Sequence, residues 1–416
     1  MATLLLPIAR QQALVYSAFL VLYEFLTYIA NDMIMPGMLN VVDSFHGREA
    51  AIALSLTAYV FGGASLQLIL GPLSDRYGRR PVMIFGALFF VVCTSLIACS
   101  GSMEQFLWAR FFQGMGLCFI SVVGYATLQD LFAEMDAIRL MAIMANVAIL
   151  APLLGPLLGA VLIYYINWRM IFVIIGVPAL FALWGLWRYM PESVGQLRCD
   201  GSRIQRVSLA PRVILRNYKQ LLSNRSFILG SFALGVIYLP CMAWIGLSPI
   251  MLVKVAGLSV KQYGLWQLPV FGAYIVGNLL LHHLTHDHSV KRLIAIGSTI
   301  AGVSLVVTYL LPHVINDSFV WLMPGLMMYF LGVGMIGGPL TRFILFATEV
   351  SKGTASALMS MLAMSIQATG IEIANIVYSR HDNRRFADYC AGVFVVYAVI
   401  LLGSAFKNTK KSENIA

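Results

Sequence analysis

Charged side chains are scarce in this chain of 416 residues, because only 11% are Asp, Glu, Lys or Arg while 60% are hydrophobic. A soluble globular domain carries about 25% charged residues, so this composition excludes a water-exposed surface of the ordinary kind. Lipid must therefore be the main solvent. One membrane-spanning helix needs about 20 mostly apolar residues, which leaves room for roughly a dozen spans.

Motifs that would indicate other classes are also missing. The sequence has no Walker loop, so we expect no ATP-driven step within the chain, and it has no HExxH or GxSxG pattern of a membrane enzyme. No basic patch is interleaved with aromatics, so the net charge of +10 does not indicate a nucleic-acid partner.

The six cysteines form no CxxC or zinc spacing, and we expect them to be buried, reduced and structural. We expect neither a metal nor a cofactor. The first apolar run is long and lacks a small-residue cleavage site, so we expect it to be retained as a helix rather than removed as a signal peptide.

Apolar runs separated by polar breaks predict an all-α protein with twelve transmembrane helices in two halves of six. We expect a six-helix bundle over residues 1–190, a basic cytoplasmic linker over 191–225, and a second bundle with a short cytoplasmic tail over 226–416. The predicted spans are 12–38, 50–72, 82–100, 104–129, 139–165, 168–190, 226–253, 262–284, 292–311, 318–345, 353–378 and 388–406.

The distribution of Lys and Arg predicts the orientation. Most of the 28 basic residues fall near the termini, in the central linker and in alternate loops, which places both termini in the cytoplasm by the positive-inside rule. Six spans on each side of a basic linker are typical of a duplicated transporter, whose halves bind substrate near the bilayer midplane. A channel or receptor would not need this duplication.

The loop after the second span, GPLSDRYGRRP over residues 71–81, resembles the GxLxDRxGRR signature of the major facilitator superfamily. Asp75 lies where it can pair with arginines and helix ends, and Gly78 permits a tight reversal. We expect this cluster to latch helix ends in one conformation; a purely topological role for a basic loop is the alternative. The candidate switch residues here are Gly71, Asp75, Arg76, Gly78, Arg79, Arg80 and, at the end of span four, Asp130.

The fifth span contains APLLGPLLG over residues 151–159, which resembles the antiporter motif of the same superfamily with its GPxxG core. Gly155 and Gly159 would permit close helix approach, and Pro156 would bend the helix. Ala160 stands where many members have glycine. The motif favours antiport, although a role in packing alone remains open.

Four further segments resemble the twelve-span drug:proton antiporters of the MdfA-like type: residues 22–38, 110–114, 144–148 and 370–373. The resemblance implies the major facilitator fold and export of lipophilic cationic and neutral drugs in exchange for protons. Its partners would be drugs, protons and the lipid bilayer, in a monomer of the bacterial inner membrane. An exporter of sugars or other metabolites on the same fold is the alternative.

Four charged residues lie well inside predicted spans: Glu24, Asp32, Arg110 and Glu372. Each costs roughly 2.5–3.5 kcal/mol at mid-bilayer, so each needs compensation or a purpose. Asp32 and Arg110 both lie about 9 Å inside the outer boundary, so they can meet directly or through water, while Glu24 lies about 12 Å deeper.

Burial favours the protonated form of a carboxylate and a nearby arginine favours the ionised form, so Asp32 has both influences that a proton carrier needs. Glu24 is either a selector of cations or a second protonatable group. For Glu372 we leave a functional and an interfacial structural role open.

Polar and compliant apolar side chains within the spans are candidate substrate contacts. Four histidines near the end of span eight, at positions 282, 283, 286 and 288, resemble a metal cluster but lie in a basic loop, so we predict no metal there. The candidate substrate-binding residues are Glu24, Tyr28, Asn31, Asp32, Leu56, Tyr59, Asn146, Ala148, Leu239, Met361, Met364 and Gln367.

Overall fold

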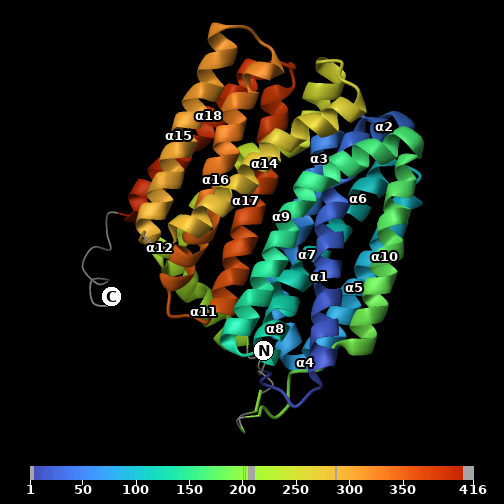
Figure 1. Ribbon diagram of the computed structural model, residues 1–416, viewed down its shortest axis with the longest axis vertical. Coiled ribbons are helices and arrows are strands. Elements are labelled where there is room, and N and C mark those ends of the chain that lie inside the picture. Colours follow the sequence, from blue (N-terminus) through green and yellow to red (C-terminus); the bar gives the residue numbers. More distant parts are fainter. Residues whose placement is uncertain (1–3, 200, 202, 205–210, 286–287, 406–416) are drawn as a thin grey trace. The chain divides into compact units, whose positions relative to one another are not determined.

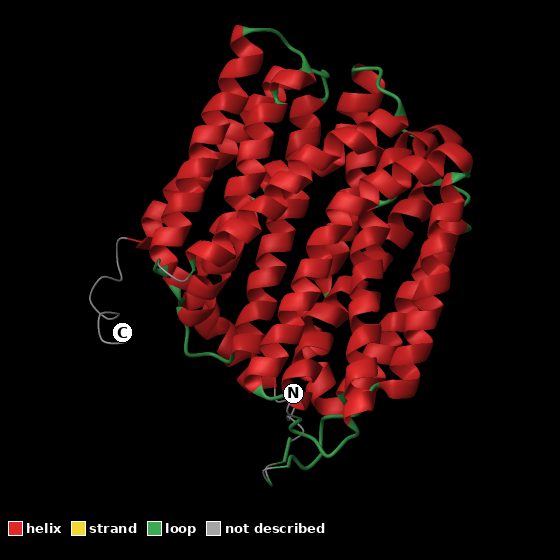
Figure 2. Cartoon of the chain, viewed as in Figure 1, coloured by secondary structure: helices red, strands yellow, loops and turns green. Residues whose placement is uncertain are grey.

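The computed structural model describes residues 4–199, 201, 203–204, 211–285 and 288–405. Across these ranges the chain is helical with no β-strand, and only two isolated bridges, Leu4–Phe132 and Leu197–Arg203, pair extended backbone (Figure 2). Helices satisfy every interior backbone group within one segment, which is what a lipid environment requires. The predicted all-α membrane fold is therefore confirmed.

Eleven helices of the described chain are long and apolar enough to cross a membrane, and a bent pair supplies a twelfth. The pair joins α3 (Ala51–Ser65) and α4 (Gln67–Tyr77) at an angle of 42°. Ser65 Oγ donates to the carbonyl of Gly62, and Gln67 Nε2 donates to that of Gly63, so side chains compete with the helical ladder at the bend. Gly and Ser pairs are a known cause of such kinks.

The described chain divides into two compact units, which we call the N-terminal and C-terminal units. The N-terminal unit comprises Met1–Ile214 and Ser259–Leu265, and the C-terminal unit comprises Leu215–Leu258 and Trp266–Ala416. The segment predicted as a linker, 191–225, is thus shared between them, and each unit is described by itself.

The described part of the N-terminal unit contains ten complete α-helices (Figure 1). Its first span is interrupted where Pro36 enters a 3₁₀ turn. Its fourth span contains a π-helix, η2. The elements are α1 Arg10–Asp32, η1 Met35–Gly37, α2 Met38–Ser44, α3 Ala51–Ser65, α4 Gln67–Tyr77, α5 Arg79–Ala98, α6 Met103–Gly114, α7 Gly116–Cys118, η2 Phe119–Gly124, α8 Tyr125–Leu131, α9 Glu134–Tyr165 and α10 Trp168–Tyr189.

The C-terminal unit repeats this all-helical design and also contains a π-helix, η3. Two helices, α11 and α14, begin in the N-terminal unit and continue here. The elements are α11 Pro211–Ser223, α12 Arg225–Ile237, α13 Leu239–Ser248, η3 Pro249–Val255, α14 Val260–Leu284, α15 Val290–Val314, η4 Phe319–Trp321, α16 Met323–Phe346, α17 Lys352–Tyr378 and α18 Asn383–Ala405.

Helix α1 is central to the N-terminal unit, because α9 and α10 pack along it (Figure 1). Its side chains from Tyr23 to Asp32 are mostly buried. Helices α3 and α6 cross closely, since a Cβ atom on Gly62 would collide with the backbone of Phe111 and one on Gly114 with that of Tyr59. These contacts place the buried polar residues of three helices side by side.

Candidate functional site

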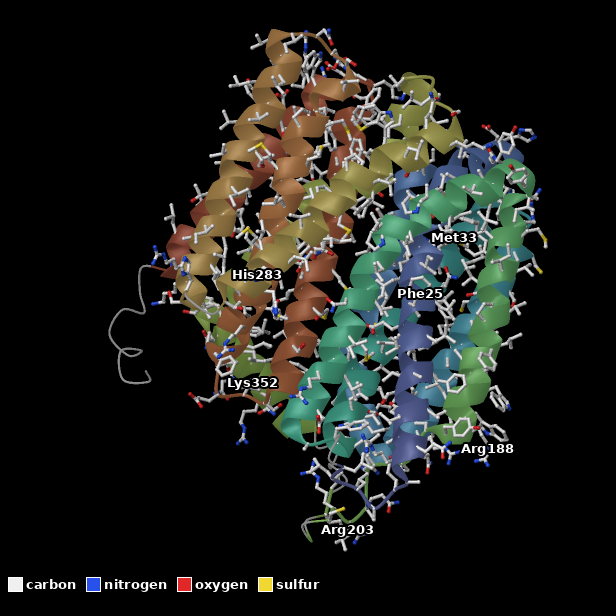
Figure 3. All side chains as sticks on the ribbon, viewed as in Figure 1. Phe25, Met33, Arg188, Arg203, His283 and Lys352 are labelled. Atoms are coloured by element: carbon white, nitrogen blue, oxygen red, sulfur yellow. The ribbon has the colours of Figure 1, made fainter. Side chains whose placement is uncertain are left out.

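Glu24, Tyr28 and Asn31 are spaced along α1 so that they share one face of the helix, and Asp32 adjoins it. Phe25 and Met33, labelled in Figure 3, directly follow Glu24 and Asp32 in the chain. Both carboxylates are buried. The predicted acidic pair therefore lies on one buried length of the first span.

Glu24 is only 1% exposed. Tyr125 donates a hydrogen bond of 2.8 Å to Glu24 Oε1, while Oε2 is buried without a partner among the described residues. Tyr125 begins α8 directly after the π-helix Phe119–Gly124, whose extra residues per turn change the direction in which the following side chains point. Glu24 thus has one oxygen fixed and one available to a ligand or proton.

Arg110 is fully buried on α6 and its guanidinium is satisfied by neutral oxygens. It donates to Asn31 Oδ1 at 2.7 Å, to Gln113 Oε1 at 2.8 Å, to the carbonyl of Ala30 at 3.2 Å and to Ser55 Oγ at 3.3 Å. A buried charge is tolerated when hydrogen bonds surround it in this way. These contacts tie α6 to α1 and α3.

We expected Asp32 and Arg110 to meet directly or through water, and of these two the direct contact is not formed. The described residues form no ion pair between them, because Asn31 lies in between: it accepts from Arg110 and donates through Nδ2 to Asp32 Oδ1 at 3.1 Å. Depth along the helix suggested a contact, but neighbouring positions on a helix point about 100° apart. Asn31 consequently faces α6, whereas Asp32 lies against Gly155 on α9.

The predicted residue Tyr59 and the unpredicted residue Gln113 extend this network. The Tyr59 ring lies under the Arg110 guanidinium at 4.6 Å, and its hydroxyl donates to the carbonyl of Thr27. Gln113, which was not among the candidate site residues, donates to Thr94 Oγ1 at 2.9 Å. It lies one turn after Arg110 on α6 and inside the segment 110–114, and these two features were the available signals.

The glycines of the fifth span pack α9 against α1. A Cβ atom on Gly155 would lie 2.6 Å from Asp32 Cβ, and one on Gly159 would overlap the carbonyl oxygen of Met33. Pro156 is buried between them. This part of the antiporter-like motif is therefore the surface that backs Asp32.

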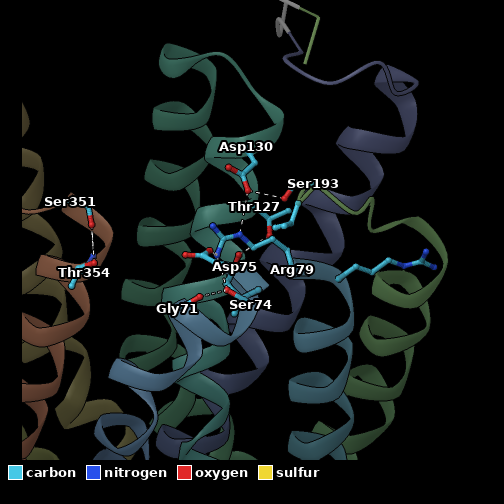
Figure 4. A network of polar contacts seen from close by, with 12 residues as sticks. Gly71, Ser74, Asp75, Arg79, Thr127, Asp130, Ser193, Ser351 and Thr354 are labelled. Carbon is cyan, nitrogen blue, oxygen red and sulfur yellow. Dashed lines mark hydrogen bonds and ion pairs between the residues drawn. The ribbon is translucent and has the colours of Figure 1, made fainter. Parts of the chain in front are cut away.

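At the end of the unit where the N-terminus lies, Arg79 is the centre of a charge cluster (Figure 4). It contacts Asp75 at 2.6 Å, Ser74 Oγ at 2.7 Å and Asp130 at 3.3 Å. Asp130 also accepts from Ser193 Oγ at 2.7 Å. The structure thus brings together α4, the start of α5, the end of α8 and the segment that follows α10.

Glu192, which we had not predicted, caps α5. Its carboxylate accepts from the backbone N–H groups of Arg79 at 2.9 Å and Arg80 at 3.2 Å. Anionic groups at a helix N-terminus are stabilising. Gly78 has a φ of 112°, and a Cβ there would also collide with Glu192.

Other residues predicted for this cluster lie around it. Arg80 donates to the carbonyl of Trp187, Arg76 lies near the Tyr77 ring, and Gly71 accepts from Ser74 Oγ.

The remaining candidate substrate contacts are only partly brought together. In the N-terminal unit, Leu56 is buried next to Ser55, whereas Asn146 is exposed and Ala148 is half-buried on α9. No hydrogen bond joins Asn146 to the network in the part of the chain described. Tyr28 lies near enough to Tyr59 and Tyr125 to interact with both electrostatically.

In the C-terminal unit, Met361, Met364 and Gln367 follow one another at three-residue spacing on α17, and all three are half-buried. Leu239 on α13 packs onto the same helix, because a Cβ on Gly370 would collide with its side chain. Leu239 therefore lies beside the part of α17 that carries Gln367, one turn before Gly370.

The structure also places the cysteines, the histidines and Glu372. Among the described cysteines Cys99 and Cys199 are exposed, which corrects the expectation that all are buried. The described residues contain no group of three metal-binding side chains, and His286 lies outside them. Glu372 is half-buried on α17.

Comparison with known proteins identifies the family. The pattern of the Major Facilitator Superfamily matches residues 20–371. The chain belongs to the Major Facilitator Superfamily. It is accordingly a multi-span membrane transporter, in a family of transporters rather than enzymes.

Relatives within the superfamily cover most of the chain. The multidrug transporter MdfA of Yersinia pestis bv. Antiqua (strain Angola) is 45% identical over 376 residues, 90% of each protein. MdfA of Escherichia coli O6:H1 is 44% identical over the same share. A solved D-xylose–proton symporter has the same fold, with a TM-score of 0.72 at 14% identity, covering 92% of this chain and 97% of that one.

Proposed function

We propose that this protein is a multidrug exporter that exchanges lipophilic cationic or neutral drugs for protons by alternating access. It would act as a monomer in the bacterial inner membrane, with both termini in the cytoplasm. The names of its relatives support drugs rather than sugars or other metabolites as substrates. The uneven distribution of basic residues supports the orientation.

The observation that carries the proposal is the different surroundings of the two buried carboxylates on α1. One oxygen of Glu24 has no partner among the described residues, which suits it to attract a cation or take a proton. Asp32 is linked through Asn31 to the Arg110 charge, so its protonation can be coupled to helix packing. We assign proton exchange to Asp32 and cation selection to Glu24.

We assign the conformational switch to two places in the N-terminal unit. The cluster of Asp75, Arg79 and Asp130 would hold helix ends together in one state and release them in another. The glycines at 155 and 159 would allow α9 to move along α1 without side chains in the way.

Drug-triggered proton release from the purified protein in detergent tests the coupling directly. Adding a drug to lightly buffered protein should release protons, and Asp32→Asn should abolish the release. Glu104→Gln is the matched control, because it makes the same carboxylate-to-amide change at an exposed site. Drug binding without proton release in the unmodified protein would contradict proton exchange.

A second comparison separates the two acids. A charge pair about 4 Å apart at an effective dielectric near 20 is worth about 4 kcal/mol before desolvation, so Glu24→Gln should weaken export of a cationic drug by about tenfold or more. Export of a neutral drug should change little. Direct transport at matched protein levels measures both, and equal loss of the two drugs would remove Glu24 as a charge selector.

A further inference from the structure

Helix α11, Pro211–Ser223, differs from the spans because its apolar and basic residues lie on different faces. Leu215, Tyr218 and Leu222 are spaced by three and four residues and share one face, while Arg216 and Lys219 share the adjacent one. Leu215 is 71% exposed and Leu222 is 56% exposed. Two large apolar side chains therefore lie on the outside of a basic helix.

Two cations of α11 have no counter-charge among the described residues. Arg216 and Lys219 are exposed, and neither makes a hydrogen bond or ion pair with any described residue. The sequence from Gly201 to His286 contains no Asp or Glu at all.

Arg225 adds a third cation directly after the helix. It is the first residue of α12 and is exposed. A cation is unfavourable at a helix N-terminus unless an anion lies nearby. No residue in the part of the chain that the structure describes supplies an anion to Arg225.

The connection to α12 fixes where α11 lies. Asn224 joins the two helices, accepts from the backbone N–H of Phe227 at 3.1 Å, and donates to the carbonyl of Ala347 at 2.7 Å. Because α12 begins a membrane span at Arg225, the end of α11 lies at the level where that span leaves the bilayer. Basic amphipathic helices at this level lie in the headgroup boundary with their apolar face toward the acyl chains.

We propose that α11 lies on the membrane surface and binds anionic phospholipid headgroups through Arg216, Lys219 and Arg225, with Leu215 and Leu222 in the acyl layer. The occupant is a lipid rather than a protein, because one phospholipid molecule carries both an anionic headgroup for the basic face of α11 and acyl chains for its apolar face. Each basic residue near an anionic surface contributes about fivefold to lipid affinity.

Titration of the purified full-length protein in detergent with fluorescent phosphatidylglycerol and phosphatidylcholine tests this proposal. The unmodified protein should prefer phosphatidylglycerol, and the double variant Arg216→Gln, Lys219→Gln should lose about 25-fold of that preference. The matched control is Lys291→Gln, Arg292→Gln, which removes two adjacent exposed cations at the start of α15. The control should keep the preference.

Three outcomes overturn the proposal: no preference for the anionic lipid in the unmodified protein, an equal loss in both double variants, or full competition by soluble glycerol phosphate, which would indicate a free-phosphate site. Unchanged thermal unfolding shows that a variant is folded. The variant Leu215→Cys, labelled after the two exposed cysteines Cys99 and Cys199 are changed to serine, provides an independent readout, because the four native cysteines that remain are buried. Lipids brominated in the acyl chain should quench its fluorophore in vesicles, and absence of quenching would place α11 off the membrane.

Discussion

Substituting Gly155 by alanine tests whether the packing of α9 on α1 positions Asp32. The added Cβ would lie 2.6 Å from Asp32 Cβ and 3.1 Å from the backbone nitrogen of Met33. Carbon atoms in contact are normally about 3.5–4.0 Å apart, so α9 and α1 must separate locally by about 1 Å. The Asp32 side chain cannot rotate away from this contact, because its Cβ is fixed to the backbone.

The expected cost combines two opposing effects. Overpacking of a tight interface costs about 1–3 kcal/mol. Alanine in place of a helical glycine restores about 0.5–1 kcal/mol of backbone preference. Gly155→Ala should therefore be destabilised by up to about 2 kcal/mol, and the displaced Asp32 should slow drug–proton exchange by about tenfold or more.

Thermal unfolding and drug-triggered proton release, measured on the same preparation, separate these effects. The control is Gly176→Ala on α10, where a Cβ would meet Thr94 Cγ2 at an ordinary 3.9 Å. That variant should be equally or more stable and should release protons normally. Normal stability and normal proton release in Gly155→Ala would show that the close contact has no importance for Asp32.

Three further expectations concern groups away from Asp32. Asp75→Asn weakens the 2.6 Å contact to Arg79, so transport should slow several-fold while drug affinity stays unchanged. Transport rate and the distances between spectroscopic labels at these helix ends measure the effect. If neither changes, the loop has only a topological role. Glu192→Ala removes the α5 cap and should lower unfolding free energy by about 1–2 kcal/mol, whereas an unchanged melting temperature would contradict the capping role. Burial and then the nearby Asp382 raise the pKa of Asp317, so its ionised form is the disfavoured one and the folded state gains stability as pH falls through that pKa. Asp317→Asn should consequently be slightly more stable than the unmodified protein at pH 7, with a gap that closes toward pH 4; a constant gap would be the contrary result.

The sequence predicted the fold class and the number of spans because both depend on properties of single segments. A run of apolar residues long enough to cross the bilayer is visible without knowing its neighbours. The motif around Asp75 and Gly78 and the glycines near Gly155 could be found in the same way. Charges inside apolar runs, such as Glu24 and Arg110, were equally evident because each is costly in lipid.

Tertiary structure decided which of these residues meet. Because of the rotation of α1 about its axis, Asn31 contacts Arg110 and Asp32 packs against Gly155. The depth of these residues along the helix did not predict these two contacts. The partner of Glu24 is Tyr125, about a hundred residues away, turned by a π-helix that has no sequence signal.

The cap on α5 has the same origin. Glu192 stands in a polar stretch after α10 and reaches Arg79 only because the folded chain returns to that end of the unit. Hydrophobicity and charge are properties of single residues. The sequence therefore determined which segments are membrane-spanning helices and which side chains are costly to bury. Which side chains contact each other depends on how each helix is rotated about its own axis and on the angle at which helices cross. Only the packing of helices that lie far apart in the chain determines these two angles.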